Sequence, residues 1–181
     1  MTQVSETITV IRDVSGIQIP DGTPVLLRAG DRVMIRQSLG GDYTVQRDCG
    51  DLVRIDGKDA DAINREPTLA AVGGPESFSE EAVWDVLRTI YDPEIPVDVV
   101  ELGLIYDCVV GDLPSGGHSV HIRMTLTAPG CGMGEILKQD VERKLAGIPG
   151  VDQVRVDIVF DPPWDQSLLS DNARLQLGLM W

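Results

Sequence analysis

A single cysteine stands in a glycine-rich corner of the sequence, in the stretch MTLTAPGCGMGEIL from Met124 to Leu137. Cys131 lies between Gly130 and Gly132, so its thiol has almost no side-chain neighbours along the chain. A helical pattern begins near Met133, and the unpaired N–H groups and dipole at a helix N-terminus lower the pKa of a nearby thiol. Because the thiolate is both a nucleophile and a metal ligand, Cys131 could do either kind of chemistry. The alternative is a tight turn in which the thiol only fills space.

The other cysteines and the two histidines are weaker candidates. Cys108 lies within the apolar alternation LIYDCVV, and we expect it in or near the core. Cys49, in RDCGD, is flanked by acids that raise a thiol pKa, and we expect it in a solvent-facing turn. For His118 and His121, on or beside a strand, we expect solvent-facing side chains rather than ligands or bases. Three widely spaced cysteines without a CxxC pair argue against a disulfide framework or a self-contained zinc site, so we expect reduced thiols.

Two acids lie in the stretch YDPEIP, from Tyr91 to Pro96, among prolines that stiffen the backbone. On spacing alone, Asp92 and Glu94 are best interpreted as solvated carboxylates in a helix terminator. The same carboxylates could instead act as hard ligands or as hydrogen-bond anchors that face the cysteine. The pattern by itself favours the terminator.

The charge of the chain excludes a general nucleic-acid-binding function. The sequence has 15 basic and 29 acidic residues, a net charge of -14 and a pI near 4.3. It therefore has no surplus of Lys and Arg to release counterions from phosphates or to bind anionic lipid. The beginning, MTQVSETITVIRD, lacks the basic and apolar regions of a signal peptide, and no run reaches the roughly 18 apolar residues of a membrane span. We expect a cytoplasmic protein without a membrane or nucleic-acid partner.

The chain divides into two halves. Between residues 60 and 80 the strand period is lost, and Pro67, Gly73, Gly74 and Pro75 indicate a linker. Before it, short apolar segments alternate with turn sequences such as PDGTP and LGGD, a pattern typical of a small all-β unit. We predict a β-rich module over residues 1–66, a linker over 67–78, an α/β domain over 79–164 and a C-terminal tail over 165–181.

The second half has the pattern of a small α/β unit. Ser77 and Glu80 could form a capping box ahead of a helix that Asp92-Pro93 ends. Strands are predicted for LGLIYDCVVG and HSVHIRMTLT, followed by a helix from about Met133 to Ala146 and a strand in VDQVRVDIVF. A strand, helix and strand in succession should place the two strands parallel through a right-handed crossover. We therefore expect an α+β fold, with a β module before an α/β domain that has a mixed sheet and two or more helices.

Four segments, DPEIPVDVVELGLIY, MTLTAPGC, IPGVDQVRVDIVFDPPW and LGLMW, together resemble a known family. The family is the small iron-sulfur assembly domain found in PaaD and in cytosolic iron-sulfur targeting factors. With its N-terminal β module, the whole chain resembles the SufT type of maturation factor that is associated with bacterial SUF systems. The resemblance covers nearly everything after about Ser79 and is looser in the N-terminal half.

The resemblance implies specific roles for residues of this chain. Cys131 corresponds to the reactive cysteine of the family's T-x-P-x-C motif, and it would be the direct ligand of an iron-sulfur cluster. Asp92, Pro93 and Glu94 correspond to the DPE motif, and Thr127 to the motif threonine, whose hydroxyl could bond to the loop or the thiolate. Many members have proline where this chain has Gly132. The implied supporting residues are Asp92, Glu94, Thr127, Gly130 and Gly132.

The implied function is an auxiliary factor for iron-sulfur cluster assembly, and not an enzyme. A cluster ordinarily takes four protein ligands, which one good cysteine cannot supply. A second copy of the chain in a homodimer, a partner protein or a small thiol would complete the site, and such a cluster would be labile. A labile cluster of undefined type suits transfer to client apoproteins, with SUF scaffold proteins as further partners.

Two other classes of function stay open. In the first, the protein is an adaptor that recruits SUF scaffold and client proteins and never binds a cluster. Its docking strip would be the end of the tail, Leu179, Met180 and Trp181, although these residues could equally pack on the core. In the second, Cys131 serves a thiol enzyme, an alternative weakened by the absence of a resolving cysteine and of a convincing base.

Overall fold

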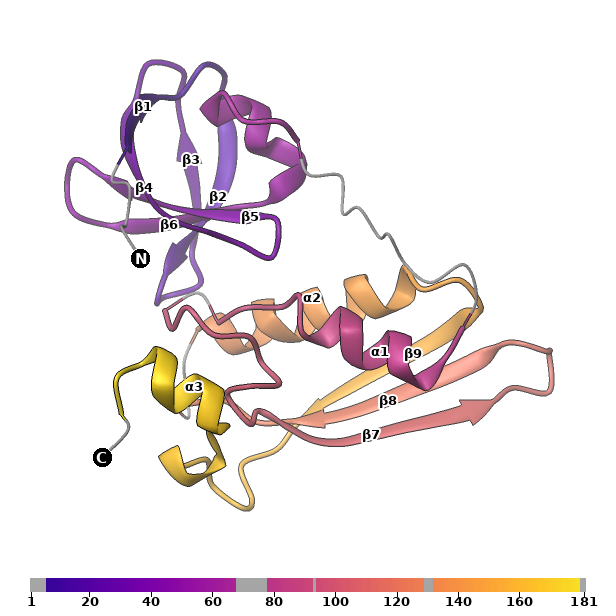
Figure 1. Cartoon of the computed structure of the whole chain (residues 1–181). Helices are drawn as coiled ribbons and strands as arrows, with labels where there is room; N and C mark the ends of the chain where they lie inside the picture. The colour runs from indigo at the N-terminus through magenta and orange to yellow at the C-terminus, as the bar shows by residue number, and fades with distance from the viewer. Residues whose placement is uncertain (1–5, 68–77, 93, 129–131, 180–181) are drawn as a thin grey trace. The chain divides into compact units, whose positions relative to one another are not determined.

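The computed structural model describes residues 6–67, 78–92, 94–128 and 132–179 of the 181-residue chain (Figure 1). The chain forms two compact units, Met1–Ala71 and Val72–Trp181. Most of the predicted linker, residues 67–78, lies outside the described residues. An α+β fold is confirmed, since one unit is built on an antiparallel sheet and the other combines a mixed sheet with helices.

The first unit is a six-stranded antiparallel sheet with the order β1-β4-β5-β6-β2-β3. Its strands curve around one apolar core, to which Val33, Val45 and Ile55 contribute fully buried side chains. A 3-10 helix, η1 (Gly57–Ile63), adds Ala62 and Ile63 to the same core. The strands are β1 (Glu6–Thr9), β2 (Val14–Ile19), β3 (Pro24–Leu27), β4 (Arg32–Leu39), β5 (Asp42–Arg47) and β6 (Leu52–Ile55).

The second unit contains a three-stranded sheet with the order β7-β8-β9. β7 (Ile105–Asp112) pairs antiparallel with β8 (His118–Met124), and β8 pairs parallel with β9 (Val151–Ile158). The connection between the parallel strands contains the helix α2 (Met133–Ala146). The predicted parallel strand pair and the helix between its strands are both confirmed.

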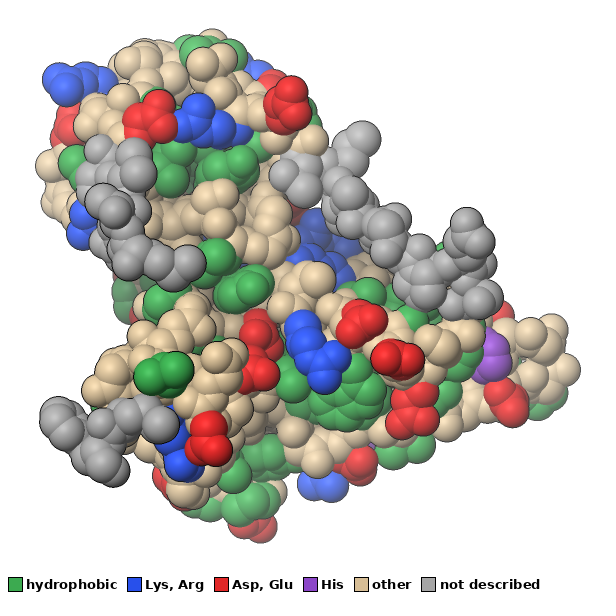
Figure 2. Space-filling model, in the orientation of Figure 1, with side chains coloured by type: hydrophobic (Ala, Val, Ile, Leu, Met, Phe, Trp, Pro, Cys, Tyr) green, Lys and Arg blue, Asp and Glu red, His purple; other side chains and the backbone are tan. Residues whose placement is uncertain are grey.

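One face of this sheet is covered by α1 (Glu80–Leu87) and α2 (Figure 1). The alternation in β8 and the four-residue spacing in α2 predict the buried positions correctly, because these side chains meet in one core. Figure 2 shows several acidic side chains grouped over α1. The buried residues from the two elements are Val120, Ile122, Met124, Met133, Leu137, Val141 and Leu145.

Three boundaries differ from the sequence-based prediction. The N-cap of α1 is Ser79, whose side chain accepts a hydrogen bond from Ala82 N, whereas the predicted cap Ser77 lies outside the described residues. The helix ends at Leu87, before Asp92-Pro93, since Thr89 N and Ile90 N donate to the carbonyls three residues back, Val86 O at 3.0 Å and Leu87 O at 3.1 Å, instead of four. β7 also begins later than predicted, after a turn at Gly103.

The C-terminal tail is structured. After β9 the chain forms a short 3-10 helix, η2 (Gln166–Leu168), and a short helix, α3 (Asp171–Gln176). Leu169 and Ala173 are buried in the core of the second unit, and Leu179 packs against its edge. Packing on the core is therefore the observed role of Leu179, while Met180 and Trp181 lie outside the described residues.

We expect Gly16→Ala to lower the free energy of unfolding by about 1–3 kcal/mol. A Cβ at Gly16 in β2 would lie 2.4 Å from Val53 Cγ1 and 2.8 Å from Arg54 O, and a buried β-branched neighbour has little freedom to move. Urea denaturation followed by circular dichroism measures the change. Ser15→Ala, at an exposed position of the same strand, is the matched control and should change stability by less than about 0.5 kcal/mol. Equal stability of the two variants would contradict the packing argument.

Candidate functional site

The cysteine loop, residues 125–132, joins the end of β8 to the start of α2. Cys131 and Gly130 lie outside the described residues, so their predicted roles stay predictions. The residues on either side are described: Leu126 is buried, and Gly132 is the exposed N-cap of α2, with φ -59° and ψ -19° and no side-chain cap bond. In the sequence, Cys131 directly precedes that N-cap, as the prediction of a strand-to-helix loop requires.

Gly134, in the first turn of α2, lets the helix pack closely on the end of β8. A Cβ at this position would lie 2.4 Å from Leu126 Cδ1. The buried glycine therefore has a packing role. It sets how closely the N-terminus of α2 approaches the strand from which the cysteine loop departs.

The acid loop, residues 91–104, carries the second predicted motif. Asp92 is only 8% exposed, and its Oδ1 accepts hydrogen bonds from Glu94 N at 2.8 Å and Ile95 N at 2.9 Å. Burial raises the pKa of Asp92, and the two N–H donors oppose this shift. The interpretation of both acids as solvated carboxylates is therefore wrong for Asp92 and correct for Glu94, which is exposed.

Asp98 repeats the same arrangement six residues later, and the sequence analysis missed it. Its Oδ1 accepts hydrogen bonds from Val100 N and Glu101 N, both at 3.0 Å. Burial is again the main cause of a raised pKa. One signal in the sequence could have indicated this role. An aspartate side chain in a turn can accept hydrogen bonds from the backbone N–H groups two and three residues later, as Asp92 does. Two capped turns thus shape an acid loop that has no helix or strand of its own.

Backbone hydrogen bonds connect the acid loop to the cysteine loop. Val99 N donates to Ile90 O at 2.9 Å, and Leu104 N donates to Val99 O at 3.0 Å. Thr125 N then donates to Leu104 O at 2.8 Å. The acid loop and the cysteine loop therefore meet where Leu104 pairs with Thr125, just beyond the Ile105–Met124 pair of the β7–β8 ladder. Asp92 and Glu94 lie at the other end of the acid loop, 12 and 10 residues before Leu104.

Thr125 carries a buried hydroxyl for which the described residues offer no hydrogen-bond partner. A buried polar atom without a partner costs about 1–3 kcal/mol. Thr127, the predicted motif threonine, is half-buried, and its side chain makes no hydrogen bond within the described part of the chain. Its predicted bond to the cysteine loop or thiolate stays a prediction.

The remaining thiols have the environments predicted for them. Cys49 is exposed, and its Sγ lies 3.3 Å from Asp51 Oδ2. Cys108, on β7, is half-buried against the core. Burial, followed by the negative charges of Glu80 and Asp107, raises the pKa of Cys108 to about 11. Deprotonation of the Cys108 thiol is therefore less favourable than that of an ordinary cysteine.

Both histidines contact a carboxylate. His118 Nδ1 lies 3.0 Å from Asp112 Oδ1, and its ring stacks on Phe78 with the centroids 3.8 Å apart. His121 Nε2 lies 2.8 Å from Asp157 Oδ2.

Within the described ranges, no three His, Cys, Asp or Glu side chains are grouped closely enough to hold a metal ion. The described part also has no helix with the length and apolarity needed to cross a membrane.

The fold and the site define a class: a small α/β domain that carries one cysteine in a strand-to-helix loop beside a capped acid loop. Residues 80–158 match the model of a family described as iron-sulfur cluster assembly protein. The chain is 42% identical over 102 residues to the Fe-S protein maturation auxiliary factor of Porphyromonas gingivalis, covering 56% of this chain and 93% of that protein. The chain belongs to the iron-sulfur cluster assembly protein family, which confirms the resemblance.

Two further relatives carry related names. The Fe-S protein maturation auxiliary factor SufT of Staphylococcus aureus is 40% identical over 90 residues, which cover 50% of this chain and 98% of that protein. An iron-sulfur cluster carrier protein of Synechocystis is 34% identical over 91 residues, covering 50% of this chain and 24% of the carrier. The matched domain therefore makes up nearly all of one relative and a quarter of the other.

We expect Thr125→Val to raise the free energy of unfolding by about 1 kcal/mol. The change replaces a buried hydroxyl without a described partner by a methyl group of similar size. Thermal and urea unfolding measure the difference, and Thr127→Val, at a half-buried position two residues on, is the control. A loss of stability in Thr125→Val alone would show that the hydroxyl has a stabilising partner.

We expect Asp92→Asn to be at least as stable as the wild type at neutral pH. The raised folded-state pKa means that Asp92 adds stability below the ordinary aspartate pKa of about 3.9, and that this contribution is lost as pH rises through the folded-state pKa. Asparagine keeps the oxygen acceptor for Glu94 N and Ile95 N without the buried charge. Unfolding free energies from neutral pH down to about pH 4 should show the advantage of the variant shrinking. An advantage that grows toward low pH would contradict the burial argument.

Proposed function

We propose that this protein is an auxiliary factor of iron-sulfur cluster assembly that carries a labile cluster, as cargo, to client apoproteins through Cys131. The observation that carries the proposal is the family membership, supported by relatives named as maturation auxiliary factors and cluster carriers. The position of Cys131 next to the N-cap of α2 supports it further, because a helix N-terminus stabilises a thiolate.

The number of available ligands favours a cluster that is carried as cargo over one that is bound permanently. Iron-sulfur clusters ordinarily take four protein ligands. Cys108 is held protonated by its raised pKa, and Cys49 belongs to the other unit of the chain. Within the described residues, no group of three ligand side chains exists that could complete a site. The remaining ligands would come from a second copy of the chain, a partner protein or a small thiol, and incomplete ligation favours release.

The acid loop would hold the cysteine loop in place for this transfer. Its backbone bonds to Thr125, and its own shape depends on Asp92 and Asp98 as caps. Asp92 therefore contributes as a cap of the backbone of its own loop, and the role left open by the sequence, an anchor that faces the cysteine loop, stays a prediction. Glu94, which is exposed, is available to contact a partner.

We further propose that the protein is not an enzyme and that it acts in the cytoplasm, where thiols are kept reduced. SUF scaffold proteins would supply the cluster, and client apoproteins would receive it. The net charge of -14 suits partners with basic surfaces and opposes self-association, so a partner or small thiol is as good a source of ligands as a homodimer.

A second candidate is an adaptor that recruits scaffold and client proteins without touching the cluster. The specific observation in its favour is the same lack of a three-ligand group within the described part of the chain. An adaptor needs surfaces rather than ligands. Cys131 would then be dispensable for the maturation of clients.

Anaerobic reconstitution with ferrous iron and sulfide tests the carrier role. We expect the wild type and Cys108→Ala to develop visible absorption and bound iron, and Cys131→Ala to lose at least about nine-tenths of both, because the ligand thiolate is gone. Cys108→Ala is the matched control, since its thiol is protonated at neutral pH. Mass in solution, measured on the same samples, shows whether a second copy completes the site.

Transfer to a client separates the two candidate functions. An apo [4Fe-4S] dehydratase, whose activity reports receipt of a cluster, is mixed with the reconstituted protein. Activation by the wild type and not by Cys131→Ala supports the carrier. Equal client maturation by the two proteins would rule the carrier out in favour of the adaptor.

A further inference from the structure

The C-terminal segment, residues 159–179, returns to the acid loop and bonds to it at three points. Trp164 Nε1 donates to Leu102 O at 2.9 Å, and Ser170 N donates to Glu101 O at 3.0 Å. Gln176 Nε2 donates to Pro96 O at 2.9 Å. These donors come from a stretch of 13 residues, counted from Trp164 to Gln176, and they reach three different carbonyls of one loop.

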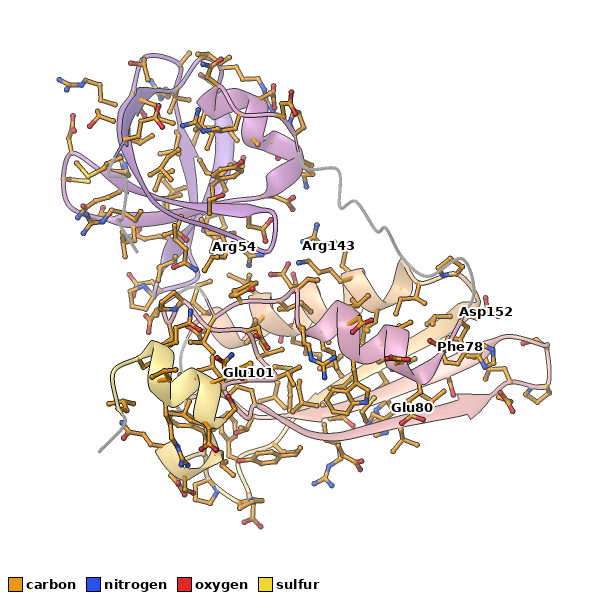
Figure 3. All side chains as sticks on the ribbon, in the orientation of Figure 1. Arg54, Phe78, Glu80, Glu101, Arg143 and Asp152 are labelled. Carbon is orange, nitrogen blue, oxygen red and sulfur yellow. The ribbon has the colours of Figure 1, made fainter. Side chains whose placement is uncertain are left out.

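A side-chain bond and a close backbone approach reinforce the contact. Ser170 Oγ donates to Glu101 Oε2, and Figure 3 shows Glu101 next to α3. Gly103 has φ +69°, and a Cβ there would lie 2.2 Å from Leu168 O. The backbone of the segment therefore rests directly on the acid loop at a position that only glycine suits.

The acid loop combines bonds of its own with these external partners. Its described residues contain no helix or strand, and they are held by the isolated bridge between Tyr91 and Asp98, by the two aspartate caps and by turn bonds such as the one from Leu102 N to Asp98 O. Carbonyls of a loop that are withdrawn from water must be bonded elsewhere. The C-terminal segment bonds three carbonyls of the loop, of which those of Leu102 and Glu101 belong to a buried and a half-buried residue, whereas that of Pro96 belongs to an exposed one. Leu169 and Ala173 fix the segment itself in the core.

We propose that the C-terminal segment is a positioning element of the functional site, in which Trp164, Ser170 and Gln176 hold the acid loop in the geometry that supports the cysteine loop. The inference rests on the proposed function, because it takes Cys131 to be the functional residue of the site. It extends the functional domain beyond residues 80–158, the span that the family model matches. The coupling path is short, because Leu104, at the end of the acid loop, accepts the hydrogen bond from Thr125 N.

Hydrogen exchange on the full-length protein without a cluster gives the first test. In Trp164→Phe, which keeps an aromatic ring and removes the N–H donor, we expect the amides of Val99, Leu102 and Leu104 to exchange about five- to tenfold faster. Gln176→Leu, near the surface, should have the same effect and covers the case in which Trp164→Phe does not fold. Leu175→Ala is the matched control, since Leu175 is 65% exposed on the same helix as Gln176.

The second test measures the site itself. The rate of Cys131 alkylation by iodoacetamide as a function of pH reports the thiol pKa, and Cys49→Ser and Cys108→Ala in the background leave Cys131 as the sole thiol. We expect Trp164→Phe and Gln176→Leu to shift the pH midpoint or change the limiting rate at least about threefold, with Leu175→Ala unchanged. Amides of β8 and β9 that keep their protection show that the fold is intact.

The outcomes are decisive in either direction. Faster exchange in the acid loop together with an altered alkylation profile supports the positioning role. Unchanged exchange in both variants, or faster exchange with an unaltered Cys131 profile, overturns it, the second result leaving the segment with a structural role only. Neither readout needs a cluster, so failure of reconstitution would overturn the proposed function without deciding this inference.

Discussion

The parallel pairing of β8 and β9 is the constraint on which the rest of the site depends. Parallel neighbours cannot be joined by a tight turn, so the chain must leave the end of β8 and cross over through α2. This crossover places the end of a strand, the cysteine loop and the N-terminus of a helix in succession. In the sequence, Cys131 directly precedes the N-cap of α2, so a thiol at the start of such a crossover helix is expected to be favoured as the thiolate.

The acid loop is organised by a different kind of interaction, namely side-chain capping of backbone N–H groups. Asp92 and Asp98 each accept two such bonds from buried or half-buried positions, where burial raises the pKa of both carboxyls and the cap bonds oppose this shift. A loop shaped in this way has no ladder of its own to resist distortion. It depends on Thr125 on one side and on the C-terminal segment on the other, which makes the site a product of three distant parts of the chain.

The thiols illustrate how environment separates residues of the same type. Cys108 lies in an apolar strand near two acids and is kept protonated, whereas Cys49 is exposed in a turn beside Asp51. Cys131 differs from both in the sequence, because it directly precedes the N-cap of α2, where a helix N-terminus favours a thiolate.

The sequence by itself determined the α+β class, the β8-α2-β9 succession and the buried positions of both elements, because periods of two and about four residues report which face is apolar. It also determined the family, through motifs whose residues are contiguous. Only the tertiary structure decided that Asp92 is buried, that Asp98 repeats its role, and that the tail holds the acid loop. Burial and hydrogen bonds between residues 60 to 80 positions apart, such as those from Trp164 and Gln176, depend on the packed core and leave no local pattern in the sequence.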